Sequence, residues 1–431
     1  MAVARVTDHV IDLGELRHEP EPEELPRPPR AVGRPLRCAL ALLVALATLA
    51  AGAPIPRRDM VVVPAVVGTE ALLADDLFLV IDPSGPRGPQ RRLEAYRLPG
   101  GELAWEAPLP VQGRYWGMSL LGDILLVTGF QQDGQTNVTV ALDRATGAYR
   151  WQQPATAVES AGGALLMETG DDERGRTLRS VDPCCGSVRW EADFPPGQLA
   201  YRLTGSAVDR VVYSTADGRV EVRDAATGAV VNRGDLWGPA DERMVNVQVV
   251  DGLLLTVGGT PATVAAYDVD RLRPLWRTQV ADALFVSECG PVICLQGRSG
   301  GLLALDPASG RRLWADDRWA GIWATRGRLV ASAVRSAGPG AEQFALLDAT
   351  TGTVLGELGR WELSRPSRLD GPLIGTRRHR GGLLVAELDV VTGTARPLDV
   401  LRGAAGECQN SSDRLVCRRV NGDYGLWPLR R

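Results

Sequence analysis

Lysine is absent from this sequence, and all 48 of its basic residues are arginines. The formal net charge is −4 at pH 7. Proteins that bind nucleic acids usually carry a basic excess that neutralises phosphates, so this balance argues against a nucleic-acid partner. The arginine bias, together with abundant alanine, glycine, valine and leucine, indicates a GC-rich bacterial genome.

Histidine is scarce, with only His9, His18 and His379 in the whole chain. None of them has a second histidine or a carboxylate at ligand spacing on one element, and no CxxC pair occurs. The sequence therefore predicts no transition-metal site and no zinc site.

The seven cysteines leave six in three local pairs once Cys38 is set apart: Cys184 with Cys185, Cys289 with Cys294, and Cys408 with Cys417. Close pairs in even number are typical of an oxidising compartment, and we expect disulfides. The last two pairs flank turn sequences and predict hairpin staples. Buried free cysteines are the alternative. The adjacent pair stands in a turn that it would stiffen, with a redox-active pair as the alternative.

The N-terminal region contains a long run without charge. Residues 1–36, rich in proline, acids and arginine, predict a disordered cytosolic tail. The run "CALALLVALATLAAGA" at 38–53 would span about 24 Å as a helix and follows Arg30, Arg34 and Arg37. We expect a single transmembrane signal-anchor over 37–56, with residues 57–431 extracytoplasmic at the cell membrane. The alternative is a cleaved signal peptide ending at Ala51-Gly52-Ala53, although Pro54 follows that bond.

One phrase recurs along the remaining chain. "ALDRATGAYRW" at 141–151 returns as "ALDPASGRRLW" at 304–314, with weaker copies elsewhere. Aligned on the residue that ends the strand, the copies stand 38 to 46 residues apart, at Arg97, Asp143, Asp182, Asp224, Asp268, Asp306, Asp348 and Asp389. A period near 42 residues indicates a repeat architecture.

Each position of the phrase has a physical reason. The aspartate can accept hydrogen bonds from the backbone of a tight turn, and the glycine four residues later can take the positive φ that the turn needs. A tryptophan four residues further on is suited to wedge against the next sheet. The strong copies are Asp143, Gly147 and Trp151, and Asp306, Gly310 and Trp314; a fair copy is Asp182, Gly186 and Trp190. In the copy at Asp268, Leu272 stands where glycine is expected.

Two further short apolar runs lie between consecutive turns, which gives four strands per period and predicts an all-β propeller of four-stranded blades. The pattern A-x-D-x-x-[TS]-G-x-x-x-W resembles the tryptophan-docking motif of the pyrroloquinoline-quinone-like (PQQ-like) propeller repeat over about residues 60–431. That resemblance implies eight blades, with seven or nine as alternatives. Residues 403–431 should close the ring with 60–67 as the outermost strand, or form an extra unit.

The resemblance implies two functional classes. One is the quinoprotein dehydrogenases, which hold PQQ and calcium on the propeller axis; the other is cofactor-free scaffolds such as the propeller lipoprotein of outer-membrane β-barrel assembly. Here the regular aspartates belong to turns and no large insertion covers an axial site. We therefore expect a binding or scaffolding protein without catalytic activity or cofactor. The alternatives are a PQQ- and calcium-dependent oxidoreductase and a sensor that couples an external ligand to the tail.

Two arginine-rich loops, 85–92 and 376–382, occupy the same place in the first and eighth units. If the ring closes between these units, their arginines would form one patch: Arg87, Arg91, Arg92, Arg377, Arg378 and Arg380. Such a patch would suit an anionic polymer, lipid head groups or an acidic protein. The alternative is a pair of solvated loops with acidic neighbours. The expected partners are thus the membrane, through 37–56, and a protein or cell-envelope component on a propeller face.

Overall fold

The computed structural model describes residues 39–43, 60–82, 91–110, 113–131, 136–171, 173–236, 244–259, 261–281, 283–297, 300–325, 327–333, 341–368 and 371–429. The chain divides into two compact units, 1–57 and 58–431. In the first, residues 39–43 are helical, while the predicted tail and the rest of the predicted anchor over 37–56 lie outside the described residues. No helix among the described residues has the length and apolar character needed to cross a membrane.

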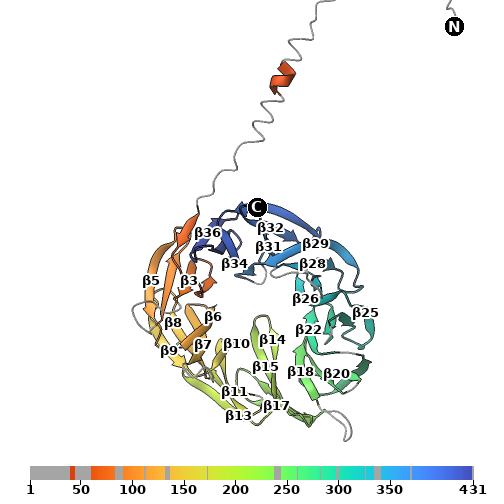
Figure 1. The fold of residues 1–431 in the computed structure, drawn as a ribbon. Coiled ribbons are helices and arrows are strands. Elements are labelled where there is room, and N and C mark those ends of the chain that lie inside the picture. The colour runs from red at the N-terminus through yellow and green to blue at the C-terminus, as the bar shows by residue number, and fades with distance from the viewer. Residues whose placement is uncertain are drawn as a thin grey trace, which may run out of the picture. The chain divides into compact units, whose positions relative to one another are not determined.

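The second unit consists of strands that follow one another around a ring (Figure 1). The first sheet contains β2 (Glu70–Leu73), β3 (Leu77–Ile81), β4 (Arg92–Arg97) and β5 (Glu102–Pro108). The next sheets contain β6 (Gly113–Leu121), β7 (Ile124–Gln131), β8 (Asn137–Asp143) and β9 (Tyr149–Gln153); β10 (Thr156–Ser160), β11 (Ala164–Asp171), β12 (Gly175–Val181) and β13 (Val188–Phe194); and β14 (Gln198–Thr204), β15 (Ala207–Ser214), β16 (Arg219–Asp224) and β17 (Val230–Asp235).

The second half of the ring repeats this order. Its strands are β18 (Met244–Val250), β19 (Leu253–Gly258), β20 (Ala262–Asp268) and β21 (Pro274–Val280); β22 (Phe285–Cys289), β23 (Val292–Gln296), β24 (Leu302–Leu305) and β25 (Arg312–Asp316); β26 (Trp319–Thr325), β27 (Arg328–Ala333), β28 (Glu342–Leu347) and β29 (Val354–Leu363); β30 (Arg365–Pro366), β31 (Ile374–His379), β32 (Gly382–Asp389) and β33 (Thr394–Leu401); and β34 (Ala404–Asn410), β35 (Arg414–Arg419) and β36 (Tyr424–Pro428).

Burial along the strands explains their sequence patterns. The middle strands are covered on both faces by neighbouring sheets, so they read as continuous apolar runs; β3, "LFLVI", is buried at every residue. The outer strands alternate, as β5 does with exposed Glu102 and buried Trp105. Buried clusters therefore lie between successive sheets, and each cluster draws residues from two neighbours.

Within each repeat the strands pair antiparallel with their sequence neighbours, in the order that the propeller prediction requires, except that the two-residue strand β30 pairs parallel with β34. Three pairings join adjacent repeats: β10 meets β15 at Ser160 and Val208, the end of β29 pairs with β31, and β30 pairs parallel with β34. The closing sheet is an additional sheet beside those that carry the aspartate turns. The predicted number of eight blades therefore stays a prediction.

The closing sheet joins the two ends of the described ring. Its strand order is β1-β36-β35-β34-β30, and β1 (Val61–Val63) pairs antiparallel with β36, so that Val63 lies opposite Tyr424. This confirms the prediction that the last strands close the ring with residues from 60–67 outermost. Phe78 of the first sheet packs on one side of the closing sheet and Val385 of β32 packs on the other.

The aspartate turns have the predicted geometry. At 143, Oδ1 accepts from the backbone N–H groups of Ala145 (3.1 Å) and Thr146 (2.9 Å). The amide of Gly147 donates to the carbonyl oxygen of Asp143 (2.8 Å), and Gly147 has a φ of 72°. The motif thus fixes a turn with backbone and side chain together.

The tryptophans dock on the glycines of the following sheet. An added Cβ at Gly186 would lie 2.9 Å from the ring of Trp151, and the indole Nε1 donates to the carbonyl oxygen of Pro183 (2.8 Å). The same pairing joins Trp105 to Gly147, Trp190 to Gly228, Trp276 to Gly310, and Trp314 to Gly352. The predicted wedge between sheets is therefore present.

The weaker copies of the phrase compensate for one another. Asn232 stands at the tryptophan position of one repeat. The following repeat, whose turn lies opposite Asn232, has Leu272 at the glycine position. Leu272 keeps the positive φ, at 53°, and its Cδ1 reaches to 3.3 Å from a Cβ built on Gly234. Asn232 and Gly234 are smaller than a tryptophan, and they leave room for the side chain of Leu272.

Candidate functional site

A groove of about 680 Å³ follows the inner strands of the ring from β10 to β22. Its walls are formed mainly by consecutive residues of β14 and β18, with shorter contributions from β12, β15 and β22. The lining is mixed: apolar side chains such as Leu199, Leu203 and Val249 alternate with polar groups, and Arg176 and Glu288 supply charges of opposite sign. Grooves of this size and mixed polarity suit binding.

Amide side chains hold the inner strands beside one another. Gln198 on β14 accepts at Oε1 from the amide of Val247 on β18 (3.1 Å), and Gln248 accepts in the same way from the amide of Val286 on β22 (3.0 Å). These bonds cross between strands that are not paired with each other, and they fix the spacing of the groove walls.

A small charged network closes the β10 side of the groove. Arg176 forms an ion pair with Glu168, and the Tyr201 hydroxyl donates to Oε2 of the same glutamate (2.6 Å). Burial raises the pKa of Tyr201 to about 12, so its hydroxyl stays protonated near neutral pH. The network therefore supplies a fixed donor and a neutralised ion pair.

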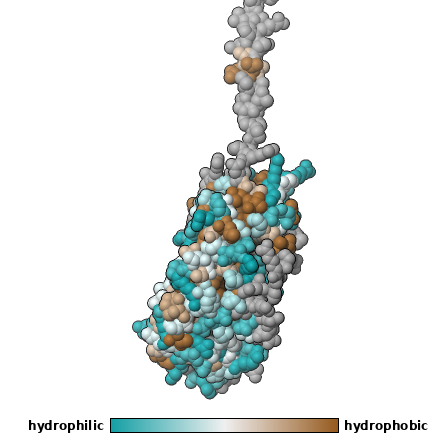
Figure 2. All heavy atoms as spheres, turned by 90° about the vertical axis from the view of Figure 1, so that its left-hand side faces the viewer, coloured by the Kyte–Doolittle hydropathy of each residue, from teal (hydrophilic) through white to brown (hydrophobic). Residues whose placement is uncertain are grey.

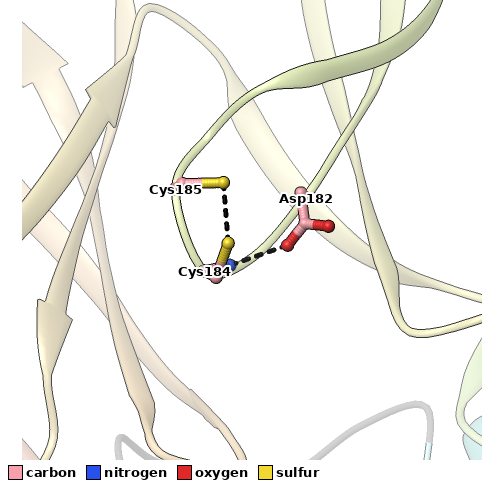
Figure 3. Close-up of side chains that lie close together, drawn as sticks. All are labelled: Asp182, Cys184 and Cys185. Carbon is pink, nitrogen blue, oxygen red and sulfur yellow. Dashed lines mark hydrogen bonds between the residues drawn. The ribbon is translucent and has the colours of Figure 1, made fainter.

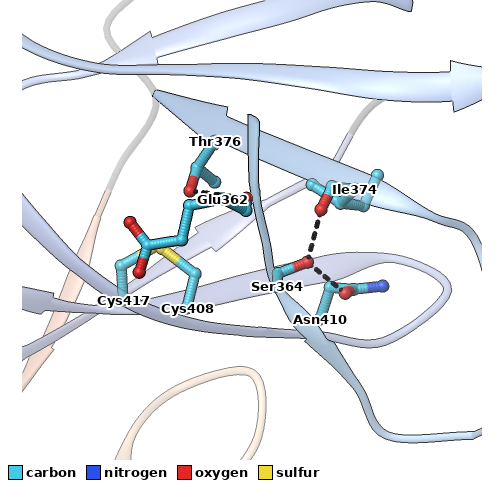
Figure 4. The surroundings of a disulfide bond; sticks show 7 residues. All are labelled: Glu362, Ser364, Ile374, Thr376, Cys408, Asn410 and Cys417. Carbon is cyan, nitrogen blue, oxygen red and sulfur yellow. Dashed lines mark hydrogen bonds between the residues drawn. A yellow bond between two sulfur atoms is a disulfide. The ribbon is translucent and has the colours of Figure 1, made fainter. Parts of the chain in front are cut away.

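The two predicted hairpin staples are present. Disulfides join Cys289 to Cys294 and Cys408 to Cys417, as the sequence predicted. The second lies beside Glu362 and a buried network in which Ser364 donates to the carbonyl oxygen of Ile374 (3.1 Å) and to Asn410 (Figure 4). This network ties the inner end of β34 to the neighbouring sheet.

The third cysteine pair differs from the disulfide prediction. Cys184 and Cys185 are free, exposed thiols with their Sγ atoms 2.6 Å apart (Figure 3). A bond between adjacent residues would close a small ring around their planar trans peptide, which is a geometric cost that the other two pairs do not have. The bond with Cys184 lowers the pKa of Cys185, and the same contact raises the pKa of Cys184 to about 12.

The predicted arginine patch is divided by the ring closure. The closing sheet stands between the first sheet and β31–β32, so the strands that flank the two loops do not belong to adjacent sheets, and residues 83–90 lie outside the described residues. Arg92 pairs with Glu106, and the guanidinium carbon of Arg377 lies 4.5 Å from the ring centroid of Trp361. Arg378 and Arg380 are exposed, Arg91 is half-buried, and Arg87 lies outside the described residues. A partner for these arginines stays a prediction.

A calcium-bound quinone would need oxygen ligands and cationic groups on the inner strands. Within the part of the chain that the structure describes, the side chains of three or more His, Cys, Asp or Glu residues meet closely only at Asp182, Cys184 and Cys185, on a turn between outer strands. The groove holds Arg176 and Glu288 as its charged lining. The described residues of the groove do not supply the ligand set of this cofactor.

The comparison with known families agrees with the turns and the docked tryptophans. A family model described as outer membrane protein assembly factor BamB matches residues 90–315 and 216–394, which together make up more than half of the chain. The chain belongs to this BamB family of PQQ-like repeat proteins. No curated protein matches the sequence.

Solved structures similar to this BamB-family chain share little sequence with it. BamB from Moraxella catarrhalis is 16% identical, with a TM-score of 0.46, and the match covers 86% of this chain and 98% of that one. The computationally designed Ika8 protein is 16% identical, with a TM-score of 0.48 and coverage of 75% and 99%. A europium-containing methanol dehydrogenase is 12% identical, with a TM-score of 0.44 and coverage of 77% and 85%.

Sequence reasoning missed the groove because its residues do not repeat. The repeat directs attention to the turns, whereas the groove is formed by inner strands that differ from one blade to the next. The signal that was available is the amide content of these strands, Gln198 in "QLAYRLT" and both Asn246 and Gln248 in "MVNVQVV". An amide on a half-buried strand indicates a hydrogen bond across a boundary.

Proposed function

We propose that this protein is an extracytoplasmic scaffold, held at the cell membrane by the segment 37–56, that binds a protein partner along the inner-strand groove. The observation that carries the proposal is the groove itself. Three features there suit a polypeptide: apolar side chains for anchoring, a neutralised ion pair at one end, and inner strands that have no second partner strand among the described residues.

The free edges favour an extended partner. Within the described residues, β14 pairs only with β15, β18 only with β19 and β22 only with β23. An edge strand presents backbone donors and acceptors to which an extended peptide can add, while neighbouring side chains provide specificity. Family membership and the two disulfides support a scaffold in an oxidising compartment.

The test compares two exposed leucines on different sheets, one on an inner strand and one on an outer strand. Leu203 lines the groove and is 60% exposed, whereas Leu103 on the outer strand β5 is 53% exposed. Leu203→Glu should abolish co-purification of partner proteins after crosslinking in the native host, and Leu103→Glu should preserve it. Equal capture by both variants, with unchanged thermal midpoints, would contradict binding in the groove.

The oxidoreductase alternative is separated by a second experiment. Full chain incubated with PQQ and calcium is assayed with an artificial electron acceptor and a range of alcohols. We expect no turnover; turnover that depends on both additions would replace the scaffold proposal.

A further inference from the structure

The turn from Asp182 to Gly186 differs from the other aspartate turns in the type of its side chains. In five of those turns the residue three positions after the aspartate is threonine or serine, and its hydroxyl donates to the aspartate carboxylate: Thr146, Thr227, Ser309, Thr351 and Thr392, at 2.5 to 3.0 Å. Cys185 occupies this position in the 182 turn. The repeat therefore aims the Cys185 side chain toward Asp182.

The neighbouring thiol lies on the same side. Cys184 keeps the backbone bond of the other turns, from its N–H to Oδ1 of Asp182 (3.0 Å), and the Sγ atoms of the two cysteines converge (Figure 3). One carboxylate oxygen and the two sulfurs all lie within 4.8 Å of one another. The other contacts are Arg189 on Oδ2 of Asp182 (2.8 Å) and Ser187 Oγ near the Cys185 sulfur (3.4 Å).

We propose that Asp182, Cys184 and Cys185 bind one thiophilic d¹⁰ cation, Zn²⁺ by preference, through two thiolates and one carboxylate oxygen. Zinc accepts these ligand types and completes a tetrahedron with water. Thiolates on one tetrahedral zinc ion lie roughly 3.7 Å apart at Zn–S distances near 2.3 Å. Both cysteines are exposed, so small side-chain rotations separate the sulfurs to that distance.

The site is independent of the proposed groove. It lies on the turn between β12 and β13, and the outer face of that turn is exposed. Trp151 packs beneath the turn on Gly186, which holds the backbone in place whether or not an ion is bound. A bound cation therefore needs no rearrangement of the sheet.

The experiment titrates the reduced full chain with Cd²⁺ under anaerobic conditions and follows the thiolate-to-cadmium charge-transfer band. We expect saturation at one ion per chain and loss of the band on addition of excess Zn²⁺. Cys184→Ala combined with Cys185→Thr places the residues of Ala145 and Thr146 of the 143 turn at these two positions and should abolish the band. Asp182→Asn, which keeps a capping oxygen, should weaken binding about tenfold or more.

The matched control is Asp143→Asn in the homologous turn, which should leave the cadmium affinity unchanged. Thermal midpoints without metal show whether Asp182→Asn and Asp143→Asn perturb folding equally. Cadmium binding that survives the double cysteine substitution would overturn the proposal. So would absence of the band in the reduced wild-type chain, or a disulfide between Cys184 and Cys185 in protein purified without reductant.

Discussion

At position 147 the indole of Trp105 leaves no space for a side chain. A Cβ built there would lie 2.4 Å from the ring, and the residue has a φ of 72°. Gly122 has a similar φ of 59°, but nothing lies within 4 Å of its Cβ position. A comparison of substitutions at Gly147 and Gly122 therefore distinguishes the cost of backbone strain from the cost of displacing the tryptophan.

Gly147→Ala should lower the free energy of unfolding more than Gly122→Ala. Both changes place a side chain in the left-handed region, at a cost of about 1–2 kcal/mol. Only the first also displaces a docked indole, which adds roughly 1–3 kcal/mol. Chemical denaturation followed by tryptophan fluorescence measures both variants. Equal decreases in the free energy of unfolding would show that the Trp105 indole moves aside without destabilising the fold.

The residues of the repeat were also the part of the molecule that the sequence predicted best. Asp143, Gly147 and Trp151 each have a local reason for their position, so the spacing alone identified the turn, the positive φ and the docking contact. The cation site at Cys184 and Cys185 was not predicted, because the search used metal-ligand spacings from known motifs. Comparison with Thr146 of the homologous turn would have shown where Cys185 points.

Among the elements, β1 determines whether the ring is closed. It contributes only Val61–Val63, yet it supplies the outer strand of the closing sheet. Val63 is fully buried, while its neighbour Val62 is 38% exposed on the other face.

Figure 2 shows the side of the molecule that includes the first sheets, where hydrophobic residues form separate patches among hydrophilic ones.

Val63→Asp should open the closing sheet, whereas Val62→Asp should be tolerated. An unpaired carboxylate in the cluster with Phe78 and Leu426 costs about 3–5 kcal/mol, and the exposed position costs little. Limited proteolysis of the full chain, read by mass spectrometry, should show new cleavage near β36 in the first variant alone. Matching cleavage patterns for the two variants would argue that β1 does not secure the ring.

The inner strands show where prediction from the sequence ended at the level of elements. Apolar runs and turn residues predict where strands form. The groove depends instead on how the inner strands of successive sheets, β14, β18 and β22, lie beside one another. Those approaches are set by side chains such as Gln198 and Gln248, whose partners are 49 and 38 residues away. A single sequence does not reveal which distant backbone groups they reach.

For the whole molecule, the aspartate turns make the free energy of unfolding decrease at low pH. The Arg150 guanidinium and the Thr146 hydroxyl lower the pKa of Asp143 to about 2, and Arg189 similarly lowers the pKa of Asp182 to about 2. Hydrogen bonds within their turns also lower the pKa values of Asp306 and Asp348. Several sheets therefore share the same dependence.

Because these pKa values are lower in the folded state than the ordinary value of 3.8, the aspartates stabilise the fold above pH 3.8 and lose that contribution as the pH falls toward 2. The thermal midpoint should therefore decrease between about pH 5 and pH 2. Asp143→Asn should flatten this decrease, and an exposed control, Asp75→Asn, should not. An identical pH profile in all three proteins would refute the assignment.

The pairing of Val61–Val63 with Tyr424–Leu426 also has a consequence for biosynthesis. Among the described strands β1 is synthesised first, yet it can pair with β36 only after almost the entire polypeptide has been made. Until then the backbone groups of β1 that face β36 have no partner strand. A chain that stops before β36 would lack the partner strand of β1, so the closing sheet could not form.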